Sequence, residues 1–527
     1  MSSDELATIA QKAAHGGLFL FVGNALSTVI LAVGIIIVAR LLGPANYGLY
    51  TLALVIPFLL ASLSDAGMSF ALVRLPARLR AEGNYTKADR LIKLGFLLKL
   101  TISALASLIC YVGSAVIATT ILNRPELTPF IRLASLVILF QAIFDGATRS
   151  FIGLDLMQYS ASIQVVQAAF KGTLGPALVL IGLGVAGAIW GYVLALAAAG
   201  LAGVMLLFAR HTRSSDRNLG SVSMGLRELL GYGLPLYLAN TLAVFLTQYQ
   251  NIVLAHFSSN VEIGNFGATW NFTTFMMILV YPITTAMFPM FSKLDPNSQR
   301  NELARGFVLA VKYTSLLMIP ASVAVMVFSR DLIYLTYGSG YTFAAHYLVL
   351  LSAIFLLTAI SYLVLGSFLS GVADTRTVIK VSILTLTVYL PLGPALAWLW
   401  GPYGLLVAYI IANAASTVYG IRRTSARFDA RPDLGASGRI LLAALGAAVP
   451  TVGLILLDGA GVGVVNLIVG GLQYFLVYLT LAPIVGAVDK QDVINLKTLL
   501  GGTRIVAVLL NPVFDYEMRL LSAKKRN

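Results

Sequence analysis

Apolar runs of about 20 residues follow one another along almost the whole chain, separated by short polar segments. A helix needs about 20 mostly apolar residues to cross a bilayer. Lipid offers no water to unpaired backbone groups, so these runs must be helices. The composition agrees, since 58% of the residues are hydrophobic, 11% are charged and the mean hydropathy is +0.87, whereas about a quarter of a soluble chain is charged. We therefore expect an all-α polytopic membrane protein.

The apolar pattern predicts about 14 transmembrane helices. Basic residues are concentrated in alternate loops, and those at 74–93, 209–231 and 422–439 alone contain many of the 36. Because cytoplasmic loops carry an excess of Lys and Arg, we expect a cell-membrane protein with both termini in the cytoplasm. The predicted spans are 16–38, 48–73, 94–118, 128–150, 160–182, 186–208, 232–255, 264–291, 306–328, 344–369, 377–398, 403–421, 440–457 and 463–486.

An internal repeat appears at an offset of 216 residues. Asn24 recurs as Asn240 and Gly48 as Gly264, with further Gly and Leu matches around them. The offset covers six predicted spans, so the two copies keep the same orientation, as in a parallel repeat. We expect a six-helix lobe at 1–213, a second lobe at 214–425, two extra helices at 426–487 and a basic cytoplasmic tail at 488–527. The apolar pieces of that tail are too short to span and suit a helix on the membrane surface.

Charge and motif content disfavour several other functions. The net charge of +14 follows the loops rather than one face, so we expect no nucleic-acid partner. The sequence contains no GxxxxGK[ST] motif, which an ATPase of the P-loop type would have. It also contains no cluster of His, Cys and Asp that would indicate a metal site. Because Cys110 is the single cysteine, an internal disulfide is excluded. We expect no cofactor and no catalytic residue.

Four motifs together resemble the polysaccharide-transporter family. They are ARLLGPANYGLY at 39–50, SDAGMSFALVR at 64–74, LGVAGAIWGYVLA at 183–195 and IPASVAVMVFSRDLIYLTYGSGY at 319–341. This family holds the lipid-linked oligosaccharide flippases, including the O-antigen flippases, within the superfamily of multidrug, oligosaccharidyl-lipid and polysaccharide exporters that also contains the MATE drug exporters.

The resemblance implies two lobes around a central cavity that opens alternately to each side of the membrane. It also implies the cargo, a polyprenyl phosphate or pyrophosphate carrying a glycan. The expected partners are this lipid-linked glycan, membrane lipids, and glycosyltransferases or a polymerase of the same pathway.

Four basic residues are candidates for binding the cargo. A charge within the bilayer costs at least about 2.5–3.5 kcal/mol on insertion scales, so it normally faces a cavity or a partner. Lys171 lies near the middle of its predicted span and could hold a phosphate or pair across helices. Arg40 and its repeat partner His256 lie at outer helix ends, where they could bind the phosphate after transfer or bond to local carbonyls. Lys312 either faces the cavity or extends to the cytoplasmic interface.

The acids within predicted spans allow two interpretations. Asp65 and Lys99 lie at similar depths on adjacent spans, so they could form an ion pair, and Asp65 could alternatively bind a proton or cation for coupling. Asp145 and Arg149 stand at i, i+4 on one span, the spacing of an intrahelical ion pair.

Polar stripes accompany these charges. Asn240, Gln248 and Asn251 fall near one face of their predicted helix, and Asn24 has the matching place in the first span. Amide groups suit sugar recognition in a cavity, and they also hold membrane helices together.

These residues leave three functional hypotheses. The first is a flippase that moves a lipid-linked oligosaccharide from the cytoplasmic to the outer leaflet, for surface polysaccharide or protein glycosylation. The second is a MATE-like, cation-coupled exporter of small molecules, which would want more buried acids. The third is a membrane glycan polymerase or glycosyltransferase, which would need a larger outer loop with catalytic residues.

Overall fold

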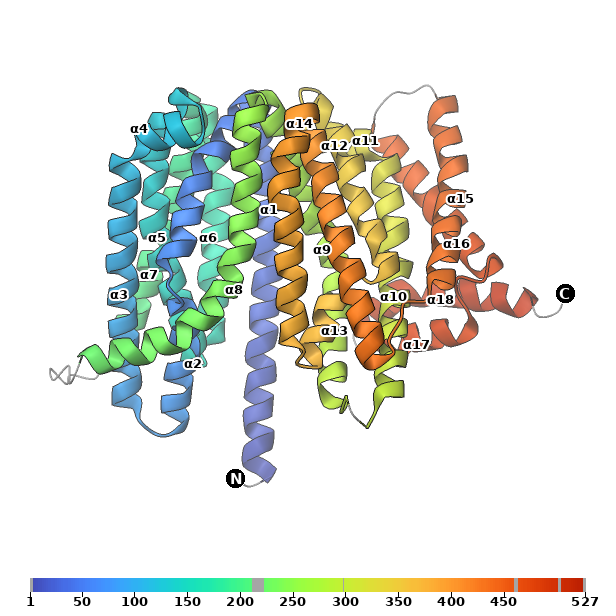
Figure 1. The fold of residues 1–527 in the computed structure, drawn as a ribbon, viewed down its shortest axis with the longest axis horizontal. Helices are drawn as coiled ribbons and strands as arrows, with labels where there is room; N and C mark the ends of the chain where they lie inside the picture. Colours follow the sequence, from blue (N-terminus) through green and yellow to red (C-terminus); the bar gives the residue numbers. More distant parts are fainter. Residues whose placement is uncertain (1–2, 211–221, 297, 459–462, 501–503, 525–527) are drawn as a thin grey trace. The chain divides into compact units, whose positions relative to one another are not determined.

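The structure, a computed structural model, describes residues 3–210, 222–296, 298–458, 463–500 and 504–524, and all its regular elements in these ranges are helices (Figure 1). The chain divides into two compact units, Met1–Gly267 and Ala268–Asn527. The predicted lobes at 1–213 and 214–425 concern the sequence repeat and stay a prediction, because the boundary between the units lies inside a later helix.

The first unit is a bundle of long helices. Its elements are α1 (Ser3–Ser64), α2 (Met68–Ala81), α3 (Tyr85–Val112), α4 (Ser114–Val116), η1 (Ile117–Ile121), η2 (Pro125–Leu127), α5 (Thr128–Gly153), α6 (Met157–Leu178), η3 (Val179–Leu183), α7 (Gly184–Arg210), α8 (Val222–Phe257) and the first residues of α9 (Asn260–Lys293). The first turns of α8 lie across the ends of α2 and α3 rather than alongside them (Figure 1).

The second unit holds the rest of α9 and the elements that follow. These are α10 (Arg300–Val327), α11 (Ser329–Tyr337), α12 (Thr342–Ala353), η4 (Ile354–Ile360), α13 (Leu365–Gly371), α14 (Thr375–Phe428), α15 (Leu434–Asp458), η5 (Asn466–Gly470), α16 (Gly471–Ile484), α17 (Lys490–Leu500) and α18 (Arg504–Lys524).

Glycines at positive φ divide the longest helical stretches. In the described part of the chain, nine stretches are long and apolar enough to cross a membrane. Three of them contain two predicted spans each, with bends at Gly43 (φ 70°), at Gly182 and Gly184, and at Gly401 (φ 56°). These φ values suit glycine, which has no Cβ to clash with the backbone. With α8 and α9 on the seventh and eighth predicted spans, the all-α polytopic fold is confirmed.

Two predicted spans are broken where the sequence suggested continuous helices. The second span stops at Ser64, turns through Asp65, Ala66 and Gly67, and resumes as α2. Ala66 and Gly67 have φ of 46° and 81°, which stops α-helical hydrogen bonding there. The tenth span is divided into α12, η4 and α13, with Ser361 at φ 75°.

The internal repeat has a direct structural counterpart in the first unit. A Cβ added to Gly48 would collide with the carbonyl oxygen of Asn260, and one added to Gly264 would collide with that of Pro44. The offset of 216 residues relates Gly48 to Gly264 and also Pro44 to Asn260. The two contacts are therefore equivalent under the repeat, and only glycine permits so close an approach of the two backbones.

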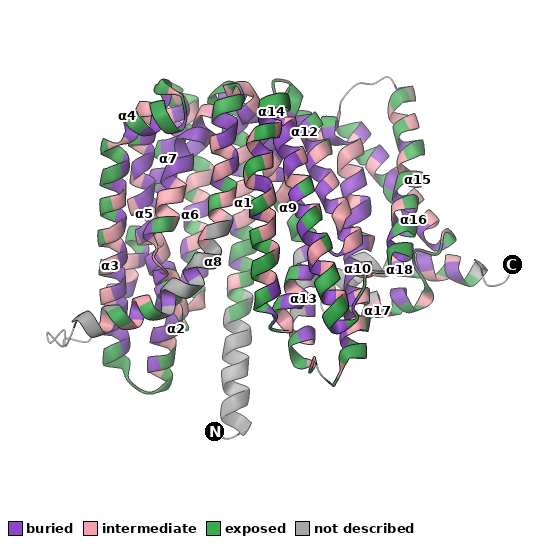
Figure 2. Cartoon of the chain, in the orientation of Figure 1, coloured by how far each residue is buried: buried purple, intermediate pink, exposed green. Residues whose placement is uncertain are grey.

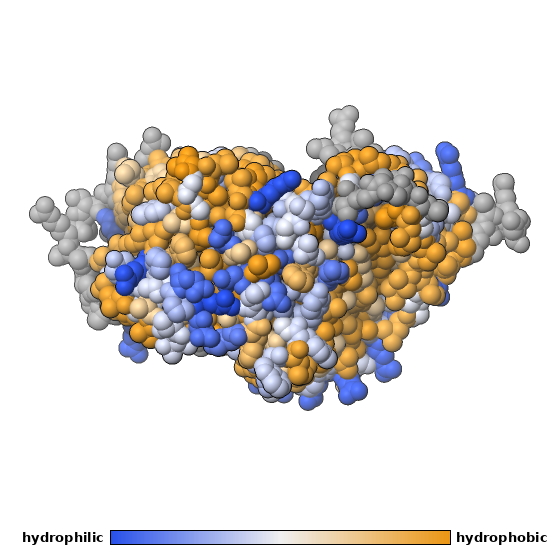
Figure 3. Space-filling model, turned by 90° about the horizontal axis from the view of Figure 1, so that it is seen from above, coloured by the Kyte–Doolittle hydropathy of each residue, from blue (hydrophilic) through white to orange (hydrophobic). Residues whose placement is uncertain are grey.

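The helix flanks carry the side-chain pattern of a membrane protein. On α3, Leu97 and Leu105 are exposed, whereas Lys99, Ser103 and Ser107 are buried (Figure 2). The end-on view in Figure 3 shows hydrophilic residues gathered on the end face and apolar residues along the flanks. Polar groups on α3 thus face the protein and apolar groups face outward, as expected for a helix surrounded by lipid.

The extra helices α15 and α16 pack tightly on α10 in the second unit. Pro320 lies inside α10, and its missing N–H leaves the carbonyl of Leu316 without its helical partner. The hydroxyl of Tyr478 donates to that carbonyl at 3.0 Å, and the hydroxyl of Tyr474 donates to the carbonyl of Pro320 at 3.0 Å. Two tyrosines one turn apart on α16 therefore satisfy the backbone around the proline.

The C-terminal segment 488–527, called the tail below, packs against the same helices. Val493, Phe514 and Leu521 are buried in one apolar cluster with residues of α10, α15 and α16. A helix on the membrane surface was predicted for the tail. The structure has two helices there, α17 and α18, and their place on a membrane surface stays a prediction. No sequence pattern indicated that they would be docked on the protein.

Candidate functional site

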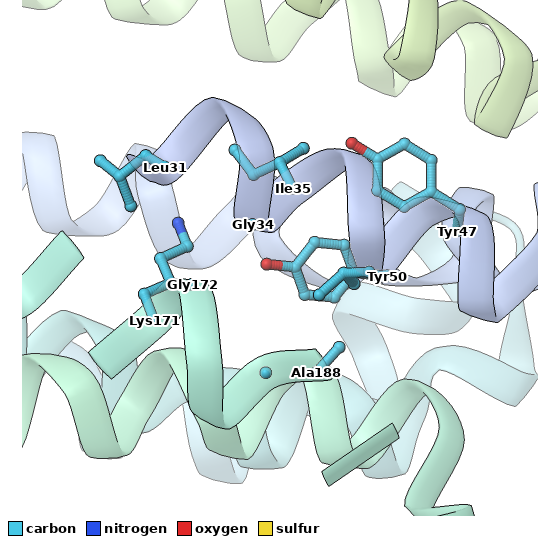
Figure 4. Close-up of a pocket in the computed structure, with 10 residues that line it drawn as sticks. Leu31, Gly34, Ile35, Tyr47, Tyr50, Lys171, Gly172 and Ala188 are labelled. Atoms are coloured by element: carbon cyan, nitrogen blue, oxygen red, sulfur yellow. The ribbon is translucent and has the colours of Figure 1, made fainter. Parts of the chain in front are cut away.

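Lys171 lies on α6 in a small pocket of the first unit that it shares with α1 and α7. Figure 4 shows its amine directed toward α1, with the rings of Tyr47 and Tyr50 further along the same pocket. The pocket is lined by Leu31, Gly34, Ile35, Val38, Tyr47, Tyr50, Lys171, Gly172, Gly175 and Ala188. Its volume is about 10 Å³, room for about one water molecule.

Glycines bring the helices close enough to form this pocket. A Cβ on Gly34 of α1 would lie only 2.6 Å from the Cα of Gly172 on α6. One on Gly191 of α7 would collide with the backbone of Gly175. Small residues at such positions let membrane helices approach closely, and they place Lys171 between three helices instead of on a lipid-facing surface.

The partner of Lys171 is an aromatic ring. Its Nζ lies 3.6 Å from the ring centroid of Tyr192 on α7, a cation–π contact. The hydroxyl of Tyr192 donates to Oε1 of Gln141 at 3.3 Å, and Nε2 of Gln141 donates to Oδ1 of Asp145 at 3.0 Å. No ion pair of Lys171 is found within the described ranges. A half-buried cation is therefore held without a carboxylate in contact with it.

The predicted pair of Asp145 and Arg149 is not formed. The Asp145 carboxylate takes its hydrogen bond from Gln141, one turn earlier on α5. Arg149, which lies one turn after Asp145 on α5, is exposed. Because helical side chains lean toward the N-terminus, the acid reaches the amide behind it, and the prediction of an ion pair here was wrong.

Asp65 and Lys99 are in contact. The Nζ of Lys99 lies 2.5 Å from Oδ1 of Asp65, with exposures of 3% and 17%. Ser69 donates to Asp65 through its hydroxyl at 2.6 Å and its backbone N–H at 3.3 Å. Tyr237 of α8 donates to the carbonyl of Leu63 at 2.9 Å. Asp65 thus anchors the start of α2 at a helix break, and its alternative role in coupling stays a prediction.

Lys312 contacts the tail. Its Nζ lies 2.5 Å from Oδ2 of Asp492 and 3.5 Å from Oδ2 of Asp489. Beside it, Asn495 donates to the hydroxyl of Tyr313 at 2.8 Å. Lys312 is 16% exposed. In this structure its amine is paired with two carboxylates, which a cargo phosphate would have to displace.

Arg40 does not share the face of α1 that borders the Lys171 pocket. Leu31 of α1 borders the pocket, and Asn24 lies two turns earlier on the same helical face. Arg40 is nine residues after Leu31, which at 100° per residue places it on the opposite face of α1. Both Arg40 and Asn24 are exposed. Their roles in binding stay predictions.

The polar stripe on α8 contains residues with unlike surroundings. Gln248 is buried, and Asn251 donates to the carbonyl of Thr247 at 3.4 Å. His256 is exposed, with Nδ1 3.0 Å from the carbonyl of its own helix at Ile252. The side chain of Asn240 lies outside the described residues. A cavity lining by this stripe stays a prediction.

The basic group that binds the end of α8 is one that the sequence did not single out. Arg124, in the segment between η1 and η2, donates to the carbonyls of Ala255 and Ser258. It therefore neutralises the carbonyl end of α8, close to His256 in sequence. No repeat pattern pointed to Arg124.

The residues around Lys171 were also missed. Tyr47, Tyr50 and Tyr192 lie within the quoted motifs, yet tyrosines are common in membrane proteins and carry no charge to attract notice. Gln141 lies in an apolar run far from them in sequence. The only sequence signal for Gln141 was that it is a polar residue within a predicted span.

Together, the bundles of long apolar helices and the enclosed basic and polar groups define a polytopic membrane protein of the transporter type. The sequence matches the family described as polysaccharide biosynthesis protein over residues 13–295. That match covers more than half of the chain, so the chain belongs to this family. The MatE family also matches, over residues 235–395.

Three known proteins illustrate the relationship. The probable low-salt glycan biosynthesis flippase Agl15 of Haloferax volcanii is 21% identical over 166 residues, which are 32% of this chain and 35% of that protein. The lipopolysaccharide biosynthesis protein WzxC of Escherichia coli is 23% identical over 420 residues, 75% of this chain and 78% of that protein. The lipid II flippase MurJ, in an inward closed conformation, gives a TM-score of 0.71 at 14% identity, covering 89% and 98% of the two chains. That likeness establishes the fold.

Proposed function

We propose that this protein is a flippase that moves a polyprenyl-(pyro)phosphate-linked oligosaccharide from the cytoplasmic to the outer leaflet by alternating access. It would serve surface polysaccharide synthesis or protein glycosylation. The observation that carries the proposal is Lys171, a half-buried cation between helices with an aromatic ring in place of an acid. The family match and the likeness to Agl15, WzxC and MurJ support it.

The cation–π contact suits a lysine that must release its partner. Such a contact contributes about 0.5–2 kcal/mol, whereas a phosphate forms charge-assisted hydrogen bonds, which are stronger. A carboxylate beside Lys171 would compete with the phosphate, and the Tyr192 ring does not. Tyr47 and Tyr50 add hydroxyls and aromatic faces against which sugars can pack.

Alternating access requires the helices around Lys171 to separate. The present pocket of about 10 Å³ is far too small for a sugar phosphate. The repeat-related contacts at Gly48 and Gly264 lie near the turn at Gly43, which the positive-inside pattern places toward the outer side. We propose that these contacts close the outer end and open when the two lobes, 1–213 and 214–425, rock. Outward movement of negative charge would gain about 2.3 kcal/mol per charge for each 100 mV of membrane potential.

The same proposal fixes the location and the partners. The protein would lie in the cell membrane with both termini in the cytoplasm, where the basic loops remain. Its cargo would come from glycosyltransferases and pass to a polymerase or transferase on the outer side. It would bind the cargo without catalysing a reaction.

A MATE-like exporter is the second candidate, because the MatE family matches residues 235–395. A site for organic cations needs an acid that is free to bind them. Asp65 is engaged by Lys99 and Ser69, and Asp145 by Gln141. The basic character of the half-buried site therefore favours the anionic cargo.

Complementation separates the two candidates. The chain would be expressed in a strain that lacks its own flippase, beside Lys171→Ala and Arg40→Ala, with membrane levels measured for each. We expect wild type to restore surface glycan and a well-expressed Lys171→Ala to fail. Resistance to cationic drugs without restoration of any tested glycan would instead identify an exporter.

A further inference from the structure

A second and much larger pocket lies in the second unit between α11 and the start of α12. Its lining consists of Ser329, Arg330, Ile333, Tyr334, Gly338, Ser339, Tyr341, Thr342, Ala345 and His346, and its volume is about 680 Å³. Pockets of about 300–1,000 Å³ are the usual size for small-molecule sites.

The ionisable groups with basic side chains in the lining, Arg330 and His346, are not accompanied by an acid in the lining. Arg330 and His346 are exposed, and neither takes part in an ion pair within the described ranges. The neighbouring acid, Asp331, is 4% exposed and accepts the backbone N–H of Gly463 at 3.0 Å. The carboxylate is thus used to hold the segment before η5 and leaves the guanidinium uncompensated.

The remaining lining supplies hydroxyls and an aromatic face. The ring of Tyr334 is 44% exposed, so both its face and its hydroxyl are available to a ligand. Ser339 and Thr342 add hydroxyls from the loop and from the first residue of α12. Tyr341 is buried, with its ring 5.3 Å from that of Tyr337.

We propose that this pocket binds a sugar-linked oxyanion, which is either the carboxylate of an acidic sugar or the phosphate of a sugar phosphate. Arg330 offers a planar fork of donors that matches both oxyanions, and His346 can add a further hydrogen bond. Tyr334 and the hydroxyls would contact the sugar. The inference rests on the proposed function, under which this end faces the outer side and the pocket receives the head group as it leaves the cavity.

Binding of soluble probes tests the site without requiring transport. The full-length protein in lipid nanodiscs would be titrated calorimetrically with glucose 1-phosphate, with a disaccharide containing glucuronate, and with neutral cellobiose. The variants are Arg330→Gln and His346→Gln, and Arg376→Gln is the matched control, an exposed arginine of α14 outside the pocket. Unchanged melting temperatures would show that the variants are folded.

We expect at least one charged probe to bind more tightly than cellobiose. Arg330→Gln should weaken that binding about tenfold, since a hydrogen bond to a charged group is lost. His346→Gln should weaken it less, and Arg376→Gln should leave it unchanged. The charged probe that binds more tightly identifies the oxyanion as phosphate or carboxylate.

Equal binding of cellobiose and both charged probes would overturn the inference, as would no binding by either charged probe or no effect of Arg330→Gln and His346→Gln. The complementation experiment fails independently. If surface glycan is restored but no charged probe binds, the proposed oxyanion site is wrong and the flippase proposal stands. If a charged probe binds and Arg330→Gln weakens that binding, but the protein moves no lipid-linked glycan, the site stands and the flippase proposal is wrong.

Discussion

Two lysines within membrane helices, one in each unit, differ in where their acid comes from. Lys99 lies near the middle of α3, and Lys312 lies near the middle of α10. In both cases a threonine stands two residues later in the sequence. Lys99 pairs with Asp65 at the helix break of its own unit. Lys312 pairs with Asp489 and Asp492 from the tail.

The second unit has no acid at the repeat position of Asp65. The offset of 216 residues relates Asp65 to Tyr281, which carries no charge. A lysine left in the bilayer without a partner is costly, and the tail supplies its carboxylates. The extra helices and the tail therefore complete the second unit. Against these two paired lysines, Lys171 stands apart, because its contact is a ring.

The largest expected effect comes from breaking the pair in the first unit. Asp65→Ala leaves Lys99, which is 3% exposed, as an uncompensated buried charge and should cost about 3–5 kcal/mol. Thermal unfolding of the purified protein in detergent measures this loss. The double variant Asp65→Ala, Lys99→Ala is the control and should recover much of the stability. An unchanged melting temperature for Asp65→Ala would contradict the account.

The next effect is a pH dependence confined to the tail. Glu517 of α18 is 6% exposed, and burial, together with the nearby Asp492 carboxylate, raises its pKa from 4.5 to about 7. The folded protein therefore keeps a proton that the unfolded chain releases. Stability should fall as the pH rises from about 4.5 to about 7, by about 3 kcal/mol at most, and remain lower above that.

Unfolding at pH 5 and pH 8 measures this dependence, with Glu517→Gln as the comparison. The variant cannot ionise, so it should lose this part of the pH response and be more stable than wild type at pH 8. An identical pH response in both proteins would show that Glu517 is not protonated in the docked tail.

A smaller effect is expected from Asp492→Ala. It removes the closer counter-ion of Lys312 and leaves Asp489, which is 64% exposed, to compensate in part. We expect a loss of about 2 kcal/mol, in the range for hydrogen bonds to charged groups. Asp489→Asn should cost less than Asp492→Ala in the same unfolding assay. The reverse order would show that the pairing seen here is not the one that stabilises the tail.

The smallest effect concerns the proline of α10. Tyr474→Phe and Tyr478→Phe each leave a backbone carbonyl without its hydroxyl donor and should cost about 1 kcal/mol. Replacing the surface residue Arg78, which pairs with exposed Glu82 on α2, is the control and should change stability by no more than about 0.5 kcal/mol. Tyrosine variants as stable as this control would remove the proposed role of α16.

Sequence reasoning located the helices well because apolar length decides where a span lies. It could not locate the helix break after Ser64, since a segment such as Asp65-Ala66-Gly67 can also continue a helix. It brought Asp65 and Lys99 together from their depth on neighbouring spans. It could not find the acids of Lys312, which lie about 180 residues later in the chain, or the ring that holds Lys171. Such contacts depend on tertiary packing, which a local pattern does not encode.

The central claim is that Lys171 binds the phosphate of the cargo, whereas Lys99 and Lys312 serve structure. The most direct test is the rate at which the purified protein in proteoliposomes moves a fluorescent lipid-linked oligosaccharide. Wild type would be compared with Lys171→Gln, Lys171→Arg and the exposed control Arg376→Gln, all with matched melting temperatures. We expect Lys171→Gln to lose at least about tenfold in rate, Lys171→Arg to retain part of it, and Arg376→Gln to match wild type. A Lys171→Gln protein that transports at the wild-type rate would contradict the claim.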